Sequence, residues 1–114
     1  MDDCLFCRII DRKIPAKIAY EDERAVAIED IHPQSPTHLL VIPRQHLPSL
    51  IESKAEDEAL LGHLFLVAAQ LAHKRGLDSR GYRTVINTGV GAGQTVFHLH
   101  VHLLGGRSFH WPPG

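Results

Sequence analysis

The sequence is short of several residue types that mark specialised classes of protein. It holds two cysteines, one tryptophan and 6% aromatic residues in 114 positions, so a disulfide-stabilised scaffold is not expected. It has no excess of either charge, because 12 Lys and Arg stand against 13 Asp and Glu, giving a net charge of −1 with histidine neutral. Polymeric DNA and RNA are therefore not expected partners, since their backbones bind to positively charged surfaces.

Long apolar runs are also missing. No stretch approaches the roughly 18 apolar residues that cross a membrane, and the first apolar segment is interrupted by Arg8, Asp11 and Arg12, unlike a secretory signal. We therefore expect no membrane partner and a cytoplasmic location. Hydrophobic residues make up 44% of the chain and charged residues 22%, which is typical of one folded domain of this length.

Histidine, by contrast, is abundant, with nine in the chain. The segment FHLHVHLL, residues 97–104, places His98, His100 and His102 at alternate positions. On a β-strand these side chains share one face at intervals of roughly 6.6 Å, while the intervening leucines and valine face the other. One buried histidine is commonly an ordinary core residue, but three in succession would each need partners for two ring nitrogens. The set therefore indicates chemistry rather than packing.

Two kinds of chemistry suit three neighbouring imidazoles. They could converge on a metal ion, since neutral imidazole is the commonest zinc ligand and a catalytic zinc takes three protein ligands plus water. Alternatively, one imidazole is a nucleophile that forms a covalent phosphohistidine, while the others orient it or stabilise charge. The glycine-rich segment GVGAGQT, residues 89–95, precedes the histidines and can turn backbone N–H groups toward a phosphate. This combination favours phosphate chemistry.

The remaining sequence pattern predicts an α+β fold. Apolar residues at helical spacing predict a short helix over about residues 4–12 and a long helix over 54–75. Strands are predicted at 17–23, 25–30, Thr37–Pro43, 82–88 and 96–104, and together they form an antiparallel sheet of about five strands.

Capping residues indicate where the two helices begin and end. Asp2 or Asp3 can cap the first helix, and Ser53 with Glu56 can form a capping box before the long one. Gly76 suits the left-handed position that follows the last turn of the long helix.

The histidine segment fits the pattern of the histidine triad family, which is His, apolar, His, apolar, His, apolar, apolar. The surrounding NTGVGAGQTVFHLHVHLLGGRSFHWPPG resembles the Hint branch, the histidine triad nucleotide-binding proteins. The similarity continues through FCRIIDRKIPAKI, DIHPQSPTHLLVIPRQH and ALLGHL, so it covers nearly the whole chain. It implies one histidine triad domain over residues 1–106 and a homodimer. The implied activity is hydrolysis of purine nucleoside phosphoramidates or aminoacyl-adenylate-like substrates.

The resemblance also implies roles for individual residues. His100 corresponds to the nucleophile that attacks the α-phosphate and carries the nucleoside monophosphate as a covalent intermediate. His102 and His38 correspond to histidines that hold the tautomer of the nucleophile and shape the phosphate site, and His98 completes the triad. Asp30 matches the carboxylate that accepts the ribose hydroxyls. Contacts to the phosphate are implied for Asn87, Gly93, Gln94 and Thr95, and contacts to the purine ring for Phe6, Ile9, Ile10, Ile31 and Leu40.

Cys4 and Cys7 form the pair CLFC near the N-terminus. Such a pair is explained by two buried core residues, by half of a structural zinc site or, less in keeping with the flanking sequence, by a redox disulfide. Some histidine triad relatives bind zinc through this cysteine pair and two histidines. The resemblance therefore implies the zinc ligands Cys4, Cys7, His46 and His98, with no metal required for catalysis.

The last segment, RSFHWPPG at residues 107–114, is predicted to be a tail, and the resemblance places it near the active site of the partner subunit. Two departures from the family pattern are Glu29, where a histidine is common, and Thr95, where a serine is common. A second function class stays open, namely a purine nucleotide-binding regulator or scaffold with incidental hydrolase activity.

Overall fold

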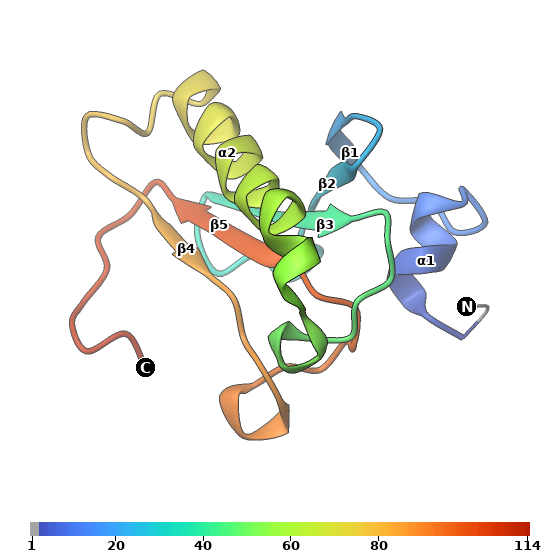
Figure 1. Ribbon diagram of the computed structural model, residues 1–114. Helices are drawn as coiled ribbons and strands as arrows, with labels where there is room; N and C mark the ends of the chain where they lie inside the picture. The colour runs from blue at the N-terminus through green and yellow to red at the C-terminus, as the bar shows by residue number, and fades with distance from the viewer. Residues whose placement is uncertain (1–2) are drawn as a thin grey trace.

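The protein is described by a computed structural model over residues 3–114, and it has the predicted α+β architecture. One antiparallel sheet has the strand order β1-β2-β3-β5-β4, and the long helix α2 crosses one of its faces (Figure 1). The strands are β1 (Ile18–Glu21), β2 (Ala25–Glu29), β3 (Thr37–Pro43), β4 (Arg83–Val85) and β5 (Val101–Gly105). The helices are α1 (Leu5–Ile10) and α2 (Glu58–Lys74), with short 3-10 helices at Leu50–Glu52, Ala55–Asp57 and Val90–Ala92.

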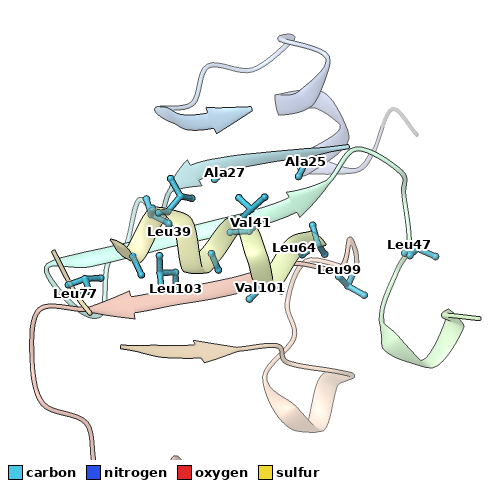
Figure 2. Packing of buried hydrophobic residues seen from close by; sticks show 14 residues of the cluster. Ala25, Ala27, Leu39, Val41, Leu47, Leu64, Leu77, Leu99, Val101 and Leu103 are labelled. Carbon is cyan, nitrogen blue, oxygen red and sulfur yellow. The ribbon is translucent and has the colours of Figure 1, made fainter. Parts of the chain in front are cut away.

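The main hydrophobic core lies between α2 and the sheet (Figure 2). Alternate residues of β3 and β5 point toward the helix, as the period of a strand requires. The helix contributes Leu64, Val67, Ala68 and Leu71, which form one apolar face because of their i, i+3, i+4, i+7 spacing. The sheet contributes Leu39, Val41, Val101 and Leu103, all fully buried.

A second apolar cluster covers the opposite face of β2 and β3. Phe6 and Ile9 of α1 pack there against the strand residues that point away from α2. Those residues are Val26, Ile28, Leu40 and Ile42. Because both faces of β3 are covered, all seven of its residues are buried, and the strand is a rigid base for the side chains at its ends.

The last strand is shorter than predicted. Residues 96–100 lie outside the sheet, and β5 begins at Val101. The backbone N–H of Leu99 donates to the carbonyl oxygen of Leu47, 2.6 Å away in the loop after β3, and not to a neighbouring strand. His98 and His100 therefore belong to an irregular segment, so the prediction of one strand over 96–104 was wrong in its first half.

The helix N-termini also differ from the capping predictions. The N-cap of α1 is Cys4, whose sulfur accepts a hydrogen bond from the N–H of Cys7 at 3.4 Å, and Asp2 lies outside the described residues. Before α2, the N–H of Lys54 donates to Asp57 Oδ2 at 2.8 Å, so the predicted pair of Ser53 and Glu56 was wrong by one position. Both alternatives offer a side-chain acceptor to the first free backbone donors, and sequence spacing alone does not distinguish them.

The C-terminus of α2 is as predicted. Gly76 has φ +71°, and the N–H groups of Gly76 and Leu77 donate to the carbonyl oxygens of His73 and Ala72 at 3.0 Å. Leu77 is buried against the core, which completes the cap. No helix within residues 3–114 is long and apolar enough to cross a membrane.

Candidate active site and metal cluster

A cavity of about 590 Å³ collects most of the residues that the sequence singled out. It opens between α1, the ends of β2 and β3, and the loop that leads into β5. Its volume is that of an ordinary small-molecule site. The predicted residues that line it are Phe6, Ile9, Asp30, Ile31, Leu40, Asn87, Gly93, Thr95, His100 and His102.

Other predicted residues lie elsewhere. Ile10 packs in the second apolar cluster and does not line the cavity. Gln94 is 3% exposed, and its side chain is fully engaged inside the protein: Oε1 accepts from Gly89 N–H at 2.8 Å, and Nε2 donates to the carbonyl oxygens of Pro48 and Val96. The side chain of Gln94 therefore braces the glycine-rich loop and does not reach the cavity.

The backbone of the glycine-rich loop is also largely engaged. The N–H groups of Ala92, Gly93 and Gln94 donate to carbonyl oxygens of the same loop, and that of Gly89 donates to Gln94. The prediction that these N–H groups form an anion-binding nest is therefore wrong for these four positions. Positive φ angles at Gly89 and Gly93 instead allow the tight turn that leads the chain into β5.

The wall that sequence reasoning missed is the connection between α1 and β1. Ile14, Pro15, Ala16 and Lys17 line the cavity together with Ile28 of β2. No local pattern in this part of the sequence marks it as the wall of a cavity.

The hydrogen bonds of His100 define which of its ring nitrogens is free. Its Nδ1 lies 2.7 Å from the carbonyl oxygen of His98, and a carbonyl oxygen only accepts. Nδ1 therefore carries the hydrogen, and in the neutral ring Nε2 carries the lone pair. Phe6 packs edge-on against this ring, with the ring centroids 5.0 Å apart. His100 thus presents an unprotonated nitrogen from a ring that is fixed on two sides.

His102 and His38 form a second defined pair. They are diagonal neighbours across β5 and β3, because His102 pairs with Leu40 and His38 with Leu104. The N–H of Gln34 donates to His38 Nδ1 at 3.0 Å, so the hydrogen of His38 is on Nε2. That hydrogen points to His102 Nδ1 at 2.9 Å, with Asp30 Oδ2 at 3.4 Å from the same nitrogen. His102 consequently carries its own hydrogen on Nε2.

The positions of the ring hydrogens indicate whether Asp30, His38 and His102 bind a metal ion or form a hydrogen-bonded support. Their ligand atoms lie close enough together to hold a metal ion. However, both nitrogens of His38 are already committed, one as an acceptor from the backbone and one as a donor to His102. The arrangement favours a hydrogen-bonded support of His102 over metal coordination.

Burial keeps the imidazoles of this site neutral. It lowers the pKa of His100 and of His38, and with the neighbouring His100 and His38 it lowers the pKa of His102 to about 4. Asp30 opposes the shift at each of these histidines. At neutral pH the empty site therefore holds neutral rings, which is the protonation state that a nucleophilic nitrogen needs.

A separate group of four residues could hold a metal ion. Cys4, Cys7, His46 and His98 bring their ligand atoms within 4.8 Å of one another, as the resemblance implied. His98 Nε2 donates to the carbonyl oxygen of Pro43 at 2.7 Å, which leaves its Nδ1 lone pair facing the two sulfurs. Burial raises the pKa of the Cys7 thiol to about 11, with Cys4 adding to the effect, so metal binding here would displace a proton.

Four of the six separations among these ligand atoms are close to the edges of a zinc tetrahedron. Zinc with ordinary bond lengths has S···N edges of about 3.6 Å and an N···N edge of about 3.3 Å. The S···N separations are 3.3 Å from Cys4 to His98, 3.4 Å from Cys7 to His46 and 3.5 Å from Cys7 to His98. The two Nδ1 atoms are 3.1 Å apart. The donor set therefore fits one small tetrahedral ion.

The chain is similar to known proteins over nearly its whole length. A family model described as "Scavenger mRNA decapping enzyme C-term binding" matches residues 3–110. A protein of Synechococcus elongatus, named as an uncharacterized HIT-like protein, is 57% identical over 113 residues, which cover 99% of this chain and 98% of that protein. The chain belongs to the histidine triad (HIT) family.

Solved structures place it in the same family. A HIT family hydrolase from Legionella pneumophila is 46% identical, with a TM-score of 0.96 over 98% of this chain and 100% of that one. A histidine triad nucleotide-binding protein from Candida albicans is 30% identical, with a TM-score of 0.83 over 96% of this chain and 83% of that one.

The depressed pKa of His102 gives the pH dependence of stability a definite sign. Its pKa is about 4 in the folded protein, against 6.5 for an unperturbed histidine, so the unfolded chain binds more protons between these values. The free energy of unfolding should be highest above about pH 6.5 and fall toward about pH 4. We expect metal-free His102→Gln to lose less unfolding free energy than wild type between pH 7 and pH 5.

Denaturant titrations at the two pH values measure this difference. The matched control is His110→Gln, which alters an exposed histidine of the tail and should follow the wild type. An equal loss of stability in wild type and His102→Gln would contradict a depressed pKa at His102.

Proposed function

We propose that this protein is a nucleotide hydrolase or transferase of the Hint type, which cleaves purine nucleoside phosphoramidates or aminoacyl-adenylate-like substrates. The observation that carries the proposal is the free Nε2 of His100 at the cavity wall. Its lone pair is available because Nδ1 carries the ring hydrogen and donates it to the carbonyl oxygen of His98 at 2.7 Å. A neutral imidazole with a fixed lone pair attacks phosphorus without prior loss of a proton.

The reaction proceeds in two displacements at the α-phosphate. In the first, the Nε2 lone pair of His100 forms a bond to phosphorus, the P–N bond of the substrate breaks, and the amine leaves with an added proton. In the second, water attacks phosphorus and gives a proton to His102, the bond to His100 breaks, and the nucleoside monophosphate is released. Each displacement forms one bond to phosphorus and breaks another, and the enzyme returns to its starting state.

His102 is proposed to deliver the proton to the leaving amine. The nitrogen of this ring that faces His38 is Nδ1, so Nε2–H is not engaged with His38. His102 also lines the cavity. A bound phosphate is anionic and favours the imidazolium form of a facing histidine, which opposes the effect of burial. It is this imidazolium form of His102 that gives its Nε2 proton to the amine and is left as a neutral ring. The side chains of Asn87 and Thr95 also line the cavity, and we assign them to contacts with the phosphate oxygens.

The apolar part of the cavity is assigned to the purine ring. Phe6, Ile9, Ile14 and Ile28 offer flat and branched apolar surface, and Asp30 lines the same cavity. Asp30 Oδ1 accepts from the N–H of His32 at 2.8 Å, which orients the carboxylate. A carboxylate in this place can accept hydrogen bonds from the two ribose hydroxyls.

A trapping experiment tests the covalent intermediate. Wild-type protein is mixed with adenosine 5′-phosphoramidate, quenched in alkali to preserve P–N bonds, and digested for peptide mass spectrometry. We expect an adenylyl group on His100, and a loss of turnover of about a thousandfold or more in His100→Ala, because the nucleophile is removed.

His73→Ala is the matched control, since His73 is an exposed histidine on α2, and it should keep both the adduct and the turnover. Turnover by His100→Ala at the wild-type rate, or an adduct on another residue, would overturn the assignment of His100.

We further propose that the four-residue cluster binds structural zinc. The support is the close approach of two thiols and two imidazoles, which are the ligands of structural zinc sites. In a reducing cytoplasm, where we expect this protein, the thiols remain available for the metal. Zinc would hold α1 to the loop after β3 and to the segment before β5, and the reaction at His100 would not pass through it.

Metal analysis of freshly purified protein tests the zinc proposal. We expect about one zinc per chain in wild type and none in the double variant Cys4→Ser/Cys7→Ser, because two of four ligands are lost. Cys4→Ser alone should bind zinc more weakly than wild type. If wild-type protein takes up no zinc when zinc is offered in excess, the proposal that this cluster binds zinc is wrong.

A homodimer is proposed on the basis of the free edge of the sheet. Within residues 3–114, β4 pairs only with β5, so its other edge can accept a strand of a second copy. The tail at residues 107–114 leaves the sheet beside β4 (Figure 1), where Arg83 donates to the carbonyl oxygen of His110 at 2.7 Å. Trp111 is 84% exposed on this tail, and we assign it to contact with the partner subunit near its cavity.

A further inference from the structure

The metal cluster and the nucleotide cavity share one helical turn. Cys4 and Cys7 flank Phe6 in the sequence, and Cys4 is the N-cap of α1. Phe6 is buried and lines the cavity together with Leu5 and Ile9 of the same helix. Any change in the position of this turn therefore reaches both sites.

His98 is the second shared element. Its ring faces the cysteines and His46, while its backbone carbonyl oxygen accepts the hydrogen bond that defines the tautomer of His100. The ring of Phe6 packs edge-on against both histidines, with centroid distances of 5.9 Å to His98 and 5.0 Å to His100. The metal ligands and the proposed nucleophile are thus one contact apart, through Phe6 and through the backbone of residue 98.

The cluster is one of two sets of contacts that hold this turn, and the other is the packing of Phe6 and Ile9 on the sheet. A helix of six residues is too short to be stable on its own. Without a metal, its N-terminal anchor consists of sulfur contacts of 3.3 to 3.5 Å to imidazoles, which are weak hydrogen bonds. A metal ion would replace them with bonds from the first turn of α1 to two other segments, and it would further restrict the motion of this turn and of Phe6. Less conformational freedom then remains to be lost when a nucleotide binds.

We propose that metal binding at the cluster and nucleotide binding in the cavity are thermodynamically coupled through Phe6 and the backbone of His98. This inference rests on the proposed nucleotide and zinc sites. Coupling between two sites typically changes an affinity by about 5- to 150-fold, and it is reciprocal. We expect zinc to tighten AMP binding by about tenfold, and AMP to tighten zinc binding by the same factor.

Two titrations measure the coupling without reference to turnover. The dissociation constant of AMP is measured by calorimetry on zinc-loaded protein and on protein stripped with a chelator, after circular dichroism shows that both are folded. The affinity for zinc is then measured by competition with a chromogenic chelator, with and without saturating AMP. Equal factors of about 5 or more in the two directions support the coupling.

Two variants test whether Phe6 transmits the coupling between zinc binding and AMP binding. Phe6→Leu retains most of the apolar volume and all four metal ligands, so it should bind zinc as wild type does but lose most of the ratio between the two AMP affinities. That ratio is the readout because Phe6 also lines the cavity, and the substitution weakens AMP binding in both metal states. Phe65→Leu, on the exposed side of α2 at 42% exposure, is the matched control and should keep the wild-type ratio.

Each failure has a separate meaning. AMP affinities that agree within twofold between the zinc-loaded and stripped forms overturn the coupling and leave both sites in place. A wild-type ratio in Phe6→Leu overturns the role of Phe6. Absence of AMP binding in both forms overturns the proposed nucleotide site, absence of zinc binding overturns the proposed metal site, and either result also overturns the coupling.

Discussion

The hydrogen bond from His100 Nδ1 to the carbonyl oxygen of His98 is the interaction on which the rest of the site depends. It is possible because the chain has not yet entered the sheet at residue 98. The Leu99 N–H bonds to the loop after β3, and the His98 carbonyl oxygen is left to accept from a side chain two residues ahead. The interruption of the expected strand is therefore what exposes a lone pair on Nε2 of His100.

Burial supplies the second condition, because it keeps the ring neutral. The pKa of His100 and that of His102 are lowered by loss of hydration, and a protonated ring would have no lone pair to offer. The same burial would be a cost without partners for the remaining nitrogens. His102 accepts a hydrogen bond from His38, and His38 accepts one from the N–H of Gln34. His100 donates one to the backbone carbonyl oxygen of His98.

Much of this architecture was predictable from the sequence, since it depends on local periodicity. β3 was predicted at its observed ends, the C-cap at Gly76 was correct, and the alternation of His and apolar residues led to the site. What the sequence did not indicate depends on contacts between distant segments. The hydrogen bond from Gln94 to Pro48, the hydrogen bond from Leu99 to Leu47, and the cavity wall before β1 all join parts of the chain that no local pattern connects.

The tautomer of His100 tests the central claim most directly. In protein labelled with ¹⁵N at histidine, long-range ¹H–¹⁵N correlation at pH 7 distinguishes a protonated from an unprotonated ring nitrogen, and the signal of His100 is assigned by its absence in His100→Ala. The structure predicts a neutral ring with hydrogen on Nδ1 and a lone pair on Nε2. A ring that carries hydrogen on Nε2, or on both nitrogens, would contradict the account of His100 as a nucleophile prepared by the carbonyl oxygen of His98.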